Sequence, residues 1–175
     1  MPSTLVLGGV RSGKSAYAMR EAEASSAAMP GGALVMIATA EAKDAEMAAR
    51  IERHRAERGE AWRTIEAPLA LAEAIRRLDR NDVAVVDCLT LWLSNLMASP
   101  VDVEDAVSEL VATLRQSPAM IWVVSNEVGW GIVPDNPLAR RFRDEAGLLH
   151  QRIGAVSTDV ILMVSGLALC LKSSS

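Results

Sequence analysis

The sequence predicts an α/β fold with a mainly parallel sheet flanked by helices. Short apolar, β-branched runs alternate with longer segments of helical periodicity, which is typical of strand–helix–strand crossovers. The runs are almost continuously apolar, as expected of parallel strands buried on both faces. With 175 residues, 50% hydrophobic and 23% charged, the chain is expected to form one globular domain, residues 1–175.

Seven strands are expected, because seven apolar runs lie between turn signals or helical segments. They are TLVLG (4–8), ALVMIA (33–38), WRTIE (62–66), DVAVVDC (82–88), AMIWVVS (119–125), DVILMVS (159–165) and LALCL (167–171). A Ser165-Gly166 turn precedes the last run, which is therefore expected to fold back as an antiparallel edge strand. The helical segments between the strands are 14–27, 41–59, 68–78, 89–98, 101–117 and 137–157.

A phosphate-binding loop is expected between the first strand and the first helix. The motif G-x-x-x-x-G-K-S is matched in full by Gly8, Gly9, Val10, Arg11, Ser12, Gly13, Lys14 and Ser15. Such glycines let backbone N–H groups turn inward around an anion, and the following helix N-terminus adds its dipole. Lys14 is expected to reach the β and γ phosphates, and Ser15 to place its hydroxyl on Mg²⁺. An ordinary glycine-rich turn is the alternative.

Polar side chains follow two of the expected strands. Asp87 lies at the end of strand 82–88, at the sheet edge where open α/β folds bind ligands, so it is expected to hold Mg²⁺ directly or through water. Its alternative role is to cap the next helix. Asn126 and Glu127 follow strand 119–125 at the equivalent edge, where they either position substrate or water or cap a loop.

His54 stands in a run of arginines, with Arg50 and Arg58 four residues to either side. The spacing alone favours an amphipathic helix with a half-buried histidine. The alternative is a phosphate-handling histidine, because an imidazole nitrogen can attack phosphorus while guanidinium groups stabilise the phosphate charge.

Composition narrows the class of protein. A net charge of −4 gives no general basic field, so nucleic-acid binding is not expected. Cys88 and Cys170 lie in apolar runs and are expected to be reduced core thiols, and His150 is expected in the core or an interface. No signal peptide and no membrane-spanning apolar stretch is visible, so a cytoplasmic enzyme is expected.

Several segments together resemble one family over nearly the whole chain. They are GGVRSGKS, IATA, DAEMAARIERHRAER, WRTIEAP, VVDCLTLWLSNLM and VSNEVGWGIVPDNPLARRFRDEAGLLHQRI. The family is the bifunctional adenosylcobinamide kinase / adenosylcobinamide-phosphate guanylyltransferase of cobalamin biosynthesis. The phosphate loop is generic, whereas MAARIERHRAER and NEVGWGIVP are much more specific to this family.

The resemblance implies two activities. The kinase phosphorylates the aminopropanol hydroxyl of adenosylcobinamide with ATP or GTP. The transferase then moves GMP from GTP onto that phosphate, which releases pyrophosphate and gives adenosylcobinamide-GDP. His54 matches the family's R-I-x-x-H segment and is implied to carry GMP covalently, which reverses the preference drawn from spacing.

The resemblance also implies further site residues, a fold and an assembly. Besides the loop 8–15, the implied guanine-nucleotide site consists of Ala38, Thr39, Ala40, Arg55, Ala56, Glu57, Arg58, Glu66 and Asp87. Relatives have serine at the position of Ala40, so only a backbone contact is implied there. A RecA-like P-loop fold and a homotrimer are implied as well. The segment LTLWLSNLM is either an interface of that trimer or a buried core helix.

Two other classes remain open, a RecA-like ATPase and another small-molecule or nucleoside monophosphate kinase. Neither requires a nucleotide on His54. The sequence does not locate the corrinoid site. Trp92 and Trp130 offer flat apolar surfaces near the expected ligand edge, although isolated tryptophans more often pack in a core.

Overall fold

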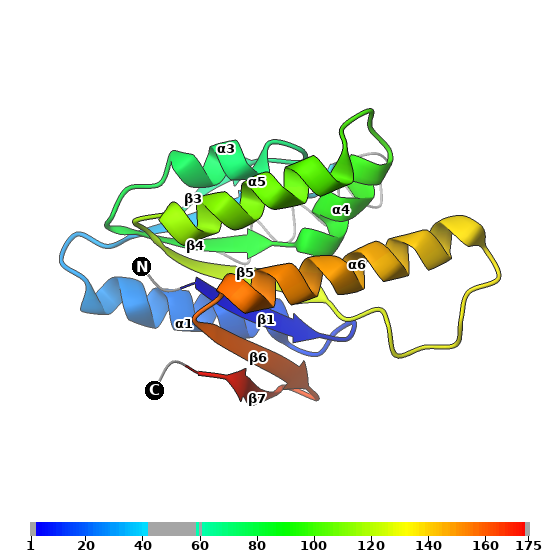
Figure 1. Cartoon of the computed structure of the whole chain (residues 1–175). Helices are drawn as coiled ribbons and strands as arrows, with labels where there is room; N and C mark the ends of the chain where they lie inside the picture. The colour runs from blue at the N-terminus through cyan, green and yellow to red at the C-terminus, as the bar shows by residue number, and fades with distance from the viewer. Residues whose placement is uncertain (1–2, 42–58, 60, 174–175) are drawn as a thin grey trace.

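The computed structural model describes residues 3–41, 59 and 61–173, and its centre is a single sheet (Figure 1). The order of the strands across the sheet is β3-β2-β4-β5-β1-β6-β7. Their bounds are β1 Ser3–Gly8, β2 Ala33–Ala38, β3 Trp62–Glu66, β4 Asp82–Asp87, β5 Met120–Asn126, β6 Asp159–Val164 and β7 Leu167–Lys172. Neighbouring strands are parallel, except that β7 runs antiparallel to β6. The carboxyl ends of β1 to β5 therefore meet at one edge.

Helices cover both faces of the sheet. The helix α1 (Lys14–Ala28) lies on one face, against β1, β2, β4 and β5. The other face is covered by α3 (Leu71–Arg76), α4 (Leu89–Met97), α5 (Val103–Gln116) and α6 (Pro137–Val156). Side chains alternate between these layers along each strand: Leu5 packs with the four-helix side, and Val6 packs with α1.

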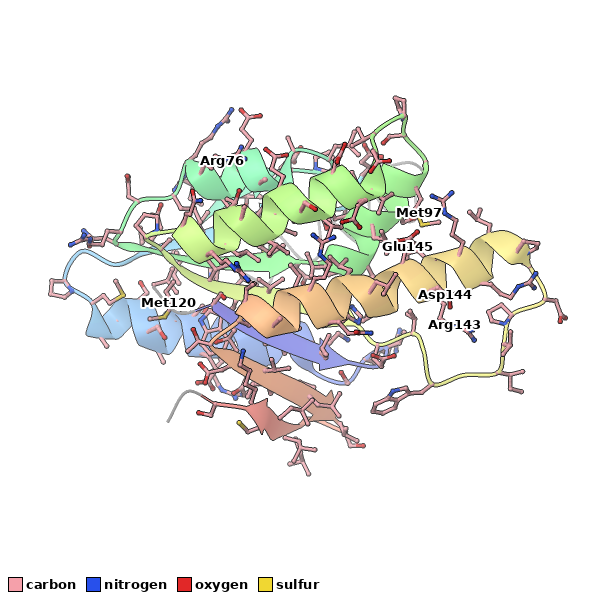
Figure 2. All side chains as sticks on the ribbon, viewed as in Figure 1. Arg76, Met97, Met120, Arg143, Asp144 and Glu145 are labelled. Carbon is pink, nitrogen blue, oxygen red and sulfur yellow. The ribbon has the colours of Figure 1, made fainter. Side chains whose placement is uncertain are left out.

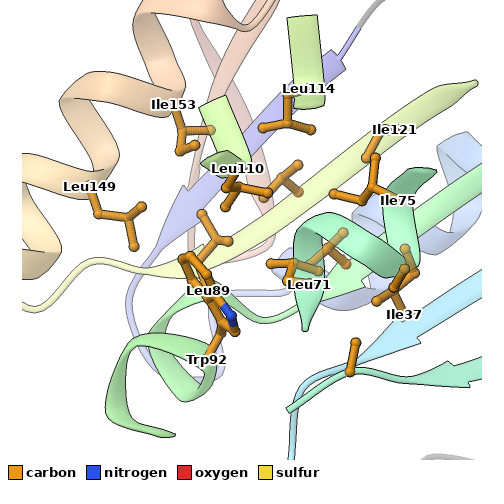
Figure 3. Close-up of a cluster of buried hydrophobic side chains, with 14 of the residues drawn as sticks. Ile37, Leu71, Ile75, Leu89, Trp92, Leu110, Leu114, Ile121, Leu149 and Ile153 are labelled. Atoms are coloured by element: carbon orange, nitrogen blue, oxygen red, sulfur yellow. The ribbon is translucent and has the colours of Figure 1, made fainter. Parts of the chain in front are cut away.

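The larger core lies between the sheet and α3 to α6. Leu71, Leu89, Trp92, Leu110 and Leu149 are each at most 1% exposed and meet there (Figure 3). Removing this much apolar surface from water is the main contribution that stabilises the layers. The segment 89–97 is thus a buried core helix, as one of the two sequence interpretations proposed.

The predicted fold class is confirmed, and the seven predicted strands are present with shifts at some ends. The predicted helix 68–78 is too long, because α3 spans only Leu71–Arg76. The carbonyls of Pro68 and Leu69 accept hydrogen bonds from the side chains of Asn95 (3.2 Å) and Trp92 (2.9 Å). Because these two carbonyls bind side chains of α4, the chain becomes helical only after Leu69.

Two other expectations have different outcomes. Of the predicted helix 41–59, residues 42–58 lie outside the described residues, and Glu41 and Gly59 have no regular secondary structure.

Cys88 is buried as predicted, but Cys170 is exposed, so its assignment to the core is wrong. Cys170 lies on the edge strand β7, whose residues are all exposed. No helix in the described part of the chain is long and apolar enough to span a membrane.

Candidate nucleotide-binding site

The predicted phosphate loop connects β1 to α1 and depends on two glycines. A Cβ on Gly8 would lie 2.5 Å from the Met163 carbonyl oxygen, so no larger residue fits between the loop and β6. Gly13 has φ of 96°, which is left-handed backbone that favours glycine, and it forms the N-cap of α1. The Ser12 carbonyl accepts a hydrogen bond from Gly166 N at 3.0 Å, so the β6–β7 turn supports the loop from behind.

Lys14 lies inside this loop rather than in solvent. The residue is only 6% exposed, and its ammonium Nζ donates to the Gly9 carbonyl at 2.7 Å. Burial lowers the pKa of Lys14, while the nearby Cys88 and Asp87 side chains raise it. Burial chiefly raises the pKa of the Cys88 thiol, which is therefore neutral near pH 7, and the Asp87 carboxylate is the charge that acts on Lys14.

Ser12 adds a further polar group to the loop. Its Oγ is buried and has no hydrogen-bond partner among the described residues. A buried hydroxyl without a partner is costly, so its presence inside a loop of inward-turned backbone is consistent with a site built for an anion. Phosphate oxygens are acceptors that would satisfy it.

The end of β4 is clamped to the end of β2. Asp87 pairs in register with Ala38. The Thr39 side chain, which is fully buried, binds the backbone of Cys88, the residue after Asp87. Thr39 Oγ1 donates to the Cys88 carbonyl (2.7 Å) and accepts from Cys88 N (2.8 Å), across an Asp87–Cys88 peptide bond that is cis. Asn95 Nδ2 in turn donates to the Thr39 carbonyl (2.8 Å). This chain of bonds fixes the backbone that carries Asp87.

The residues present fit a magnesium ion bound together with nucleotide phosphates. Ser15 and Asp87 are both half-buried at the same edge and supply oxygen ligands, which Mg²⁺ prefers. The described residues contain no group of three or more histidine, cysteine or acidic side chains arranged so that it could hold a metal ion. An ion here would therefore be completed by phosphate oxygens and water, as is usual for magnesium in nucleotide sites.

The implied guanine-site residues of β2 and β3 lie farther along this edge. Ala38 is the last residue of β2, and Thr39 and Ala40 follow it. Glu66 ends β3 in register with Ala38. β2 is the third strand from β1, which corresponds to about 14 Å at the usual strand spacing, and β3 is the fourth, at about 19 Å. Asp87 thus lies near enough to act on the charge of Lys14, whereas Glu66 lies apart from the phosphate loop at the end of β3.

Several residues of the expected site cannot be placed. His54, Arg55, Ala56, Glu57 and Arg58 lie outside the described residues. The connection that contains them leaves the sheet at the carboxyl end of β2, next to Asp87 in register.

Asn126 and Glu127 both form contacts at the end of β5. Asn126 Nδ2 donates to Thr90 Oγ1 at 2.7 Å. Glu127 Oε1 accepts from Gly129 N (2.6 Å), which is the predicted loop-capping role, and Glu127 N donates to the Gly8 carbonyl (2.9 Å). The Asp87 capping alternative is not observed, because Cys88 is the N-cap of α4.

A buried histidine lies behind Glu127. His150, buried in α6 as predicted, shares a 2.7 Å hydrogen bond with Ser125, and its Nδ1 is 3.8 Å from Glu127 Oε2. Burial lowers the pKa of His150, and Glu127 partly opposes that effect.

The sequence interpretation missed the supporting residues, and the structure separates the two tryptophans. Asn95, Thr90 and the Ser125–His150 pair were not predicted, because their partners are 25 to 56 residues away in the chain. Trp92 is 1% exposed and donates to the Leu69 carbonyl, so it packs in the core, as the sequence favoured for isolated tryptophans. Trp130 is 77% exposed.

The fold and the loop define the class of the protein. The sheet order, the loop between β1 and α1, and an acidic residue at the end of β4 are those of a P-loop fold. Solved structures agree with this fold. The flagellar accessory protein FlaH from Methanocaldococcus jannaschii superposes with a TM-score of 0.55 over 99% of this chain and 79% of its own, at 15% identity. A KaiC-like protein from Pyrococcus horikoshii OT3 does so with a TM-score of 0.52, over 92% and 70%, at 12% identity.

Sequence relatives define the family. The chain belongs to the cobinamide kinase / cobinamide phosphate guanyltransferase family, whose model matches residues 4–171. It is 46% identical to the bifunctional adenosylcobalamin biosynthesis protein CobP of Pseudomonas aeruginosa, over 96% of each chain. It is 38% identical to CobU of Escherichia coli K12, over 96% of this chain and 98% of that one. The predicted resemblance, and with it the prediction of an enzyme of this family, is confirmed.

Proposed function

We propose that this protein catalyses two consecutive reactions on a corrinoid, at one nucleotide-binding edge. In the first, the hydroxyl of adenosylcobinamide attacks the γ-phosphorus of ATP or GTP. In the second, GMP from GTP is joined to the resulting phosphate to give adenosylcobinamide-GDP. Family membership at 46% and 38% identity over nearly the full length supports the pair of activities.

In the kinase step, the loop 8–15 binds the phosphates. Its backbone N–H groups and the start of α1 face the anion, and Lys14 leaves the Gly9 carbonyl to bind the β and γ phosphates. Ser15 and Asp87 would hold Mg²⁺, which when bound neutralises phosphate charge. Because Lys14 is already buried, little water has to be removed from it when the nucleotide arrives.

In the transfer step, His54 is the proposed nucleophile. Its ring nitrogen attacks the α-phosphorus of GTP, an N–P bond forms, and the P–O bond to pyrophosphate breaks. A phosphate oxygen of adenosylcobinamide phosphate then attacks the same phosphorus, and the N–P bond breaks. Arg55, Ala56, Glu57 and Arg58 are proposed to line the nucleotide beside His54, where the two arginines would stabilise the phosphate charge.

The residues along β2 and β3 are proposed to bind the guanosine part of GTP. Ala38, Thr39, Ala40 and Glu66 lie on the same edge as Lys14 and Asp87, over a span comparable to an extended nucleotide. A nucleotide placed along this edge would have its phosphates near β1 and β4 and its base near β3. The resemblance further supports a homotrimer, and the need for ATP or GTP supports a cytoplasmic location.

The observation that carries this proposal is Lys14, buried within a complete phosphate loop at the sheet edge that also carries Asp87 and from which the His54 connection leaves. The test is His54→Ala, assayed with adenosylcobinamide, GTP and Mg²⁺. The variant should still form adenosylcobinamide phosphate and should form no adenosylcobinamide-GDP. Formation of the GDP product at the parental rate would contradict the proposal. Arg53→Ala serves as a matched control, since it lies next to His54 but outside the proposed site.

A further inference from the structure

The connection between β5 and α6 exposes a run of large apolar side chains. Trp130 is 77% exposed, Ile132 96%, Val133 59%, and Leu138 at the start of α6 is 63% exposed. Single exposed apolar residues are common on proteins, but a contiguous run indicates a binding surface. Residues 128–133, VGWGIV, also contain no charged or polar side chain. We call residues 128–138 the apolar loop.

The apolar loop is continuous with the nucleotide site. It follows Glu127, whose backbone N–H donates to the carbonyl of Gly8, the first residue of the phosphate loop (2.9 Å). It also leaves the sheet from β5, which lies between β4 with Asp87 and β1 with the phosphate loop. Figure 1 shows this yellow segment extending from the carboxyl edge of the sheet before it enters α6.

Both ends of the apolar loop are held in place. At its start, Glu127 accepts from Gly129 N. At its end, Arg140 donates to the carbonyls of Pro134 (2.8 Å) and Asp135 (2.7 Å), and Asn136 Oδ1 caps α6 by accepting from Leu138 N (2.8 Å). A surface positioned in advance loses less conformational entropy when a ligand binds.

A pocket lies beside the end of the loop. It has a volume of about 330 Å³ and is mostly apolar, and it lies between the end of α4 and the start of α6, with Met97, Leu138 and Phe142 among its lining residues. Figure 2 shows Met97 at this place on α4. The volume falls within the range of small-molecule sites, about 300–1,000 Å³.

We propose that the apolar loop and this pocket bind the corrin ring of the acceptor substrate, an inference that rests on the function proposed above. The acceptor hydroxyl has to reach the γ-phosphate at loop 8–15, so a ring much larger than its hydroxyl arm must lie on surface that adjoins this edge. A corrin ring offers broad apolar faces, which match the exposed faces of Trp130 and Ile132. A second set of exposed apolar side chains in the described chain consists of Leu167, Leu169 and Leu171 on β7. It is farther from Asp87, because β5, β1 and β6 lie between β4 and β7 in the sheet.

The test compares the double variant Trp130→Ser/Ile132→Ser with the parental protein. Loss of two large apolar contacts should raise the Kd of adenosylcobinamide, measured by equilibrium dialysis, by about tenfold or more. The KM for adenosylcobinamide in the kinase assay should rise in parallel, and more than kcat falls. Covalent labelling of the enzyme by α-labelled GTP, a half-reaction that needs no acceptor, should proceed as in the parental protein.

Leu148→Ser is the matched control, because Leu148 is a 56% exposed apolar residue on α6 outside the apolar loop. It should leave both Kd and labelling at parental values. An unchanged acceptor Kd in the double variant would overturn the proposal. An unchanged Kd together with an altered oligomeric state, measured by analytical ultracentrifugation, would also overturn it and assign the loop to contacts between copies of the chain. If the parental protein itself showed neither labelling nor kinase activity, the proposed function would fail, and this inference with it.

Discussion

Two regions meet at the carboxyl edge of the sheet, and they are built in opposite ways. Around β1, β2 and β4, Lys14, Thr39 and Cys88 are buried and hydrogen-bonded to one another's backbone or to close neighbours. The apolar loop after β5 is held only at its ends, and Trp130 and Ile132 between those ends are exposed. This difference matches the two proposed roles. The hydrogen-bonded polar groups act on the phosphates, and the exposed apolar surface binds the acceptor.

The largest effect is expected from the polar region. Lys14→Ala removes the cation proposed to bind the phosphates, so both reactions should slow by about 100-fold or more. The measurement is kcat for formation of each product at saturating acceptor. Circular dichroism spectra of the variant should match those of the parental protein, because within the described residues the Lys14 side chain donates to its own loop. A parental rate for either product would contradict the assignment of both reactions to the loop 8–15.

Asp87→Asn should have the next largest effect. The amide keeps the shape of the side chain but loses the charge proposed to hold Mg²⁺, so the Mg²⁺ concentration for half-maximal rate should rise about tenfold. Titration of the kinase rate with Mg²⁺ checks this. The apolar loop contains none of the proposed metal ligands, so Trp130→Ser should leave the midpoint in place. A shift of equal size in both variants would contradict the proposal that Asp87, and not the apolar loop, holds Mg²⁺.

Thr39→Val tests whether the buried clamp on Asp87 stabilises the fold. The change leaves Cys88 N and the Cys88 carbonyl without the Thr39 hydroxyl, so the free energy of unfolding should fall by about 2 kcal/mol. Thr39→Ser, which retains the hydroxyl, is the matched control and should lose clearly less. Urea unfolding of both variants measures the difference. Equal losses would mean that the hydroxyl bonds contribute no more to stability than the methyl group that Thr39→Ser removes.

The smallest effect is expected where the two regions join. His150 has a pKa below the usual 6.5 because of burial, so the unfolded chain binds more protons than the folded one just below pH 6.5. Stability should therefore fall as the pH is lowered from about 6.5 toward the folded-state pKa. Ser125 and Glu127 face the ring, and Glu127 limits the effect. In His150→Gln this slope should shrink, as followed by thermal unfolding between pH 5 and 8; an identical slope would assign the pH dependence to other groups.

The polar region was largely predictable from the sequence, and the apolar loop was not. Gly8, Gly13 and Lys14 form a local motif whose spacing determines the backbone, and Asp87 ends an unmistakable apolar strand. The clamp of Thr39 on Cys88 joins residues 49 positions apart, which no local pattern encodes. The two tryptophans illustrate the same limit, because Trp92 and Trp130 looked alike in sequence, and only the packing of α4 against Leu69 separates the buried one from the exposed one.

In the proposed function, this edge binds GTP for attack by His54 as well as for phosphorylation of the acceptor. Its most direct test is incubation of the parental, Lys14→Ala and His54→Ala proteins with α-labelled GTP and Mg²⁺, followed by acid and alkali treatment of the denatured protein. The parental protein should carry one label that is acid-labile and alkali-stable, as an N–P bond to histidine is. His54→Ala should carry no label, and Lys14→Ala far less than the parental protein. Acid-labile GMP on the His54→Ala protein would mean that another residue carries the nucleotide and that the role proposed for His54 is wrong.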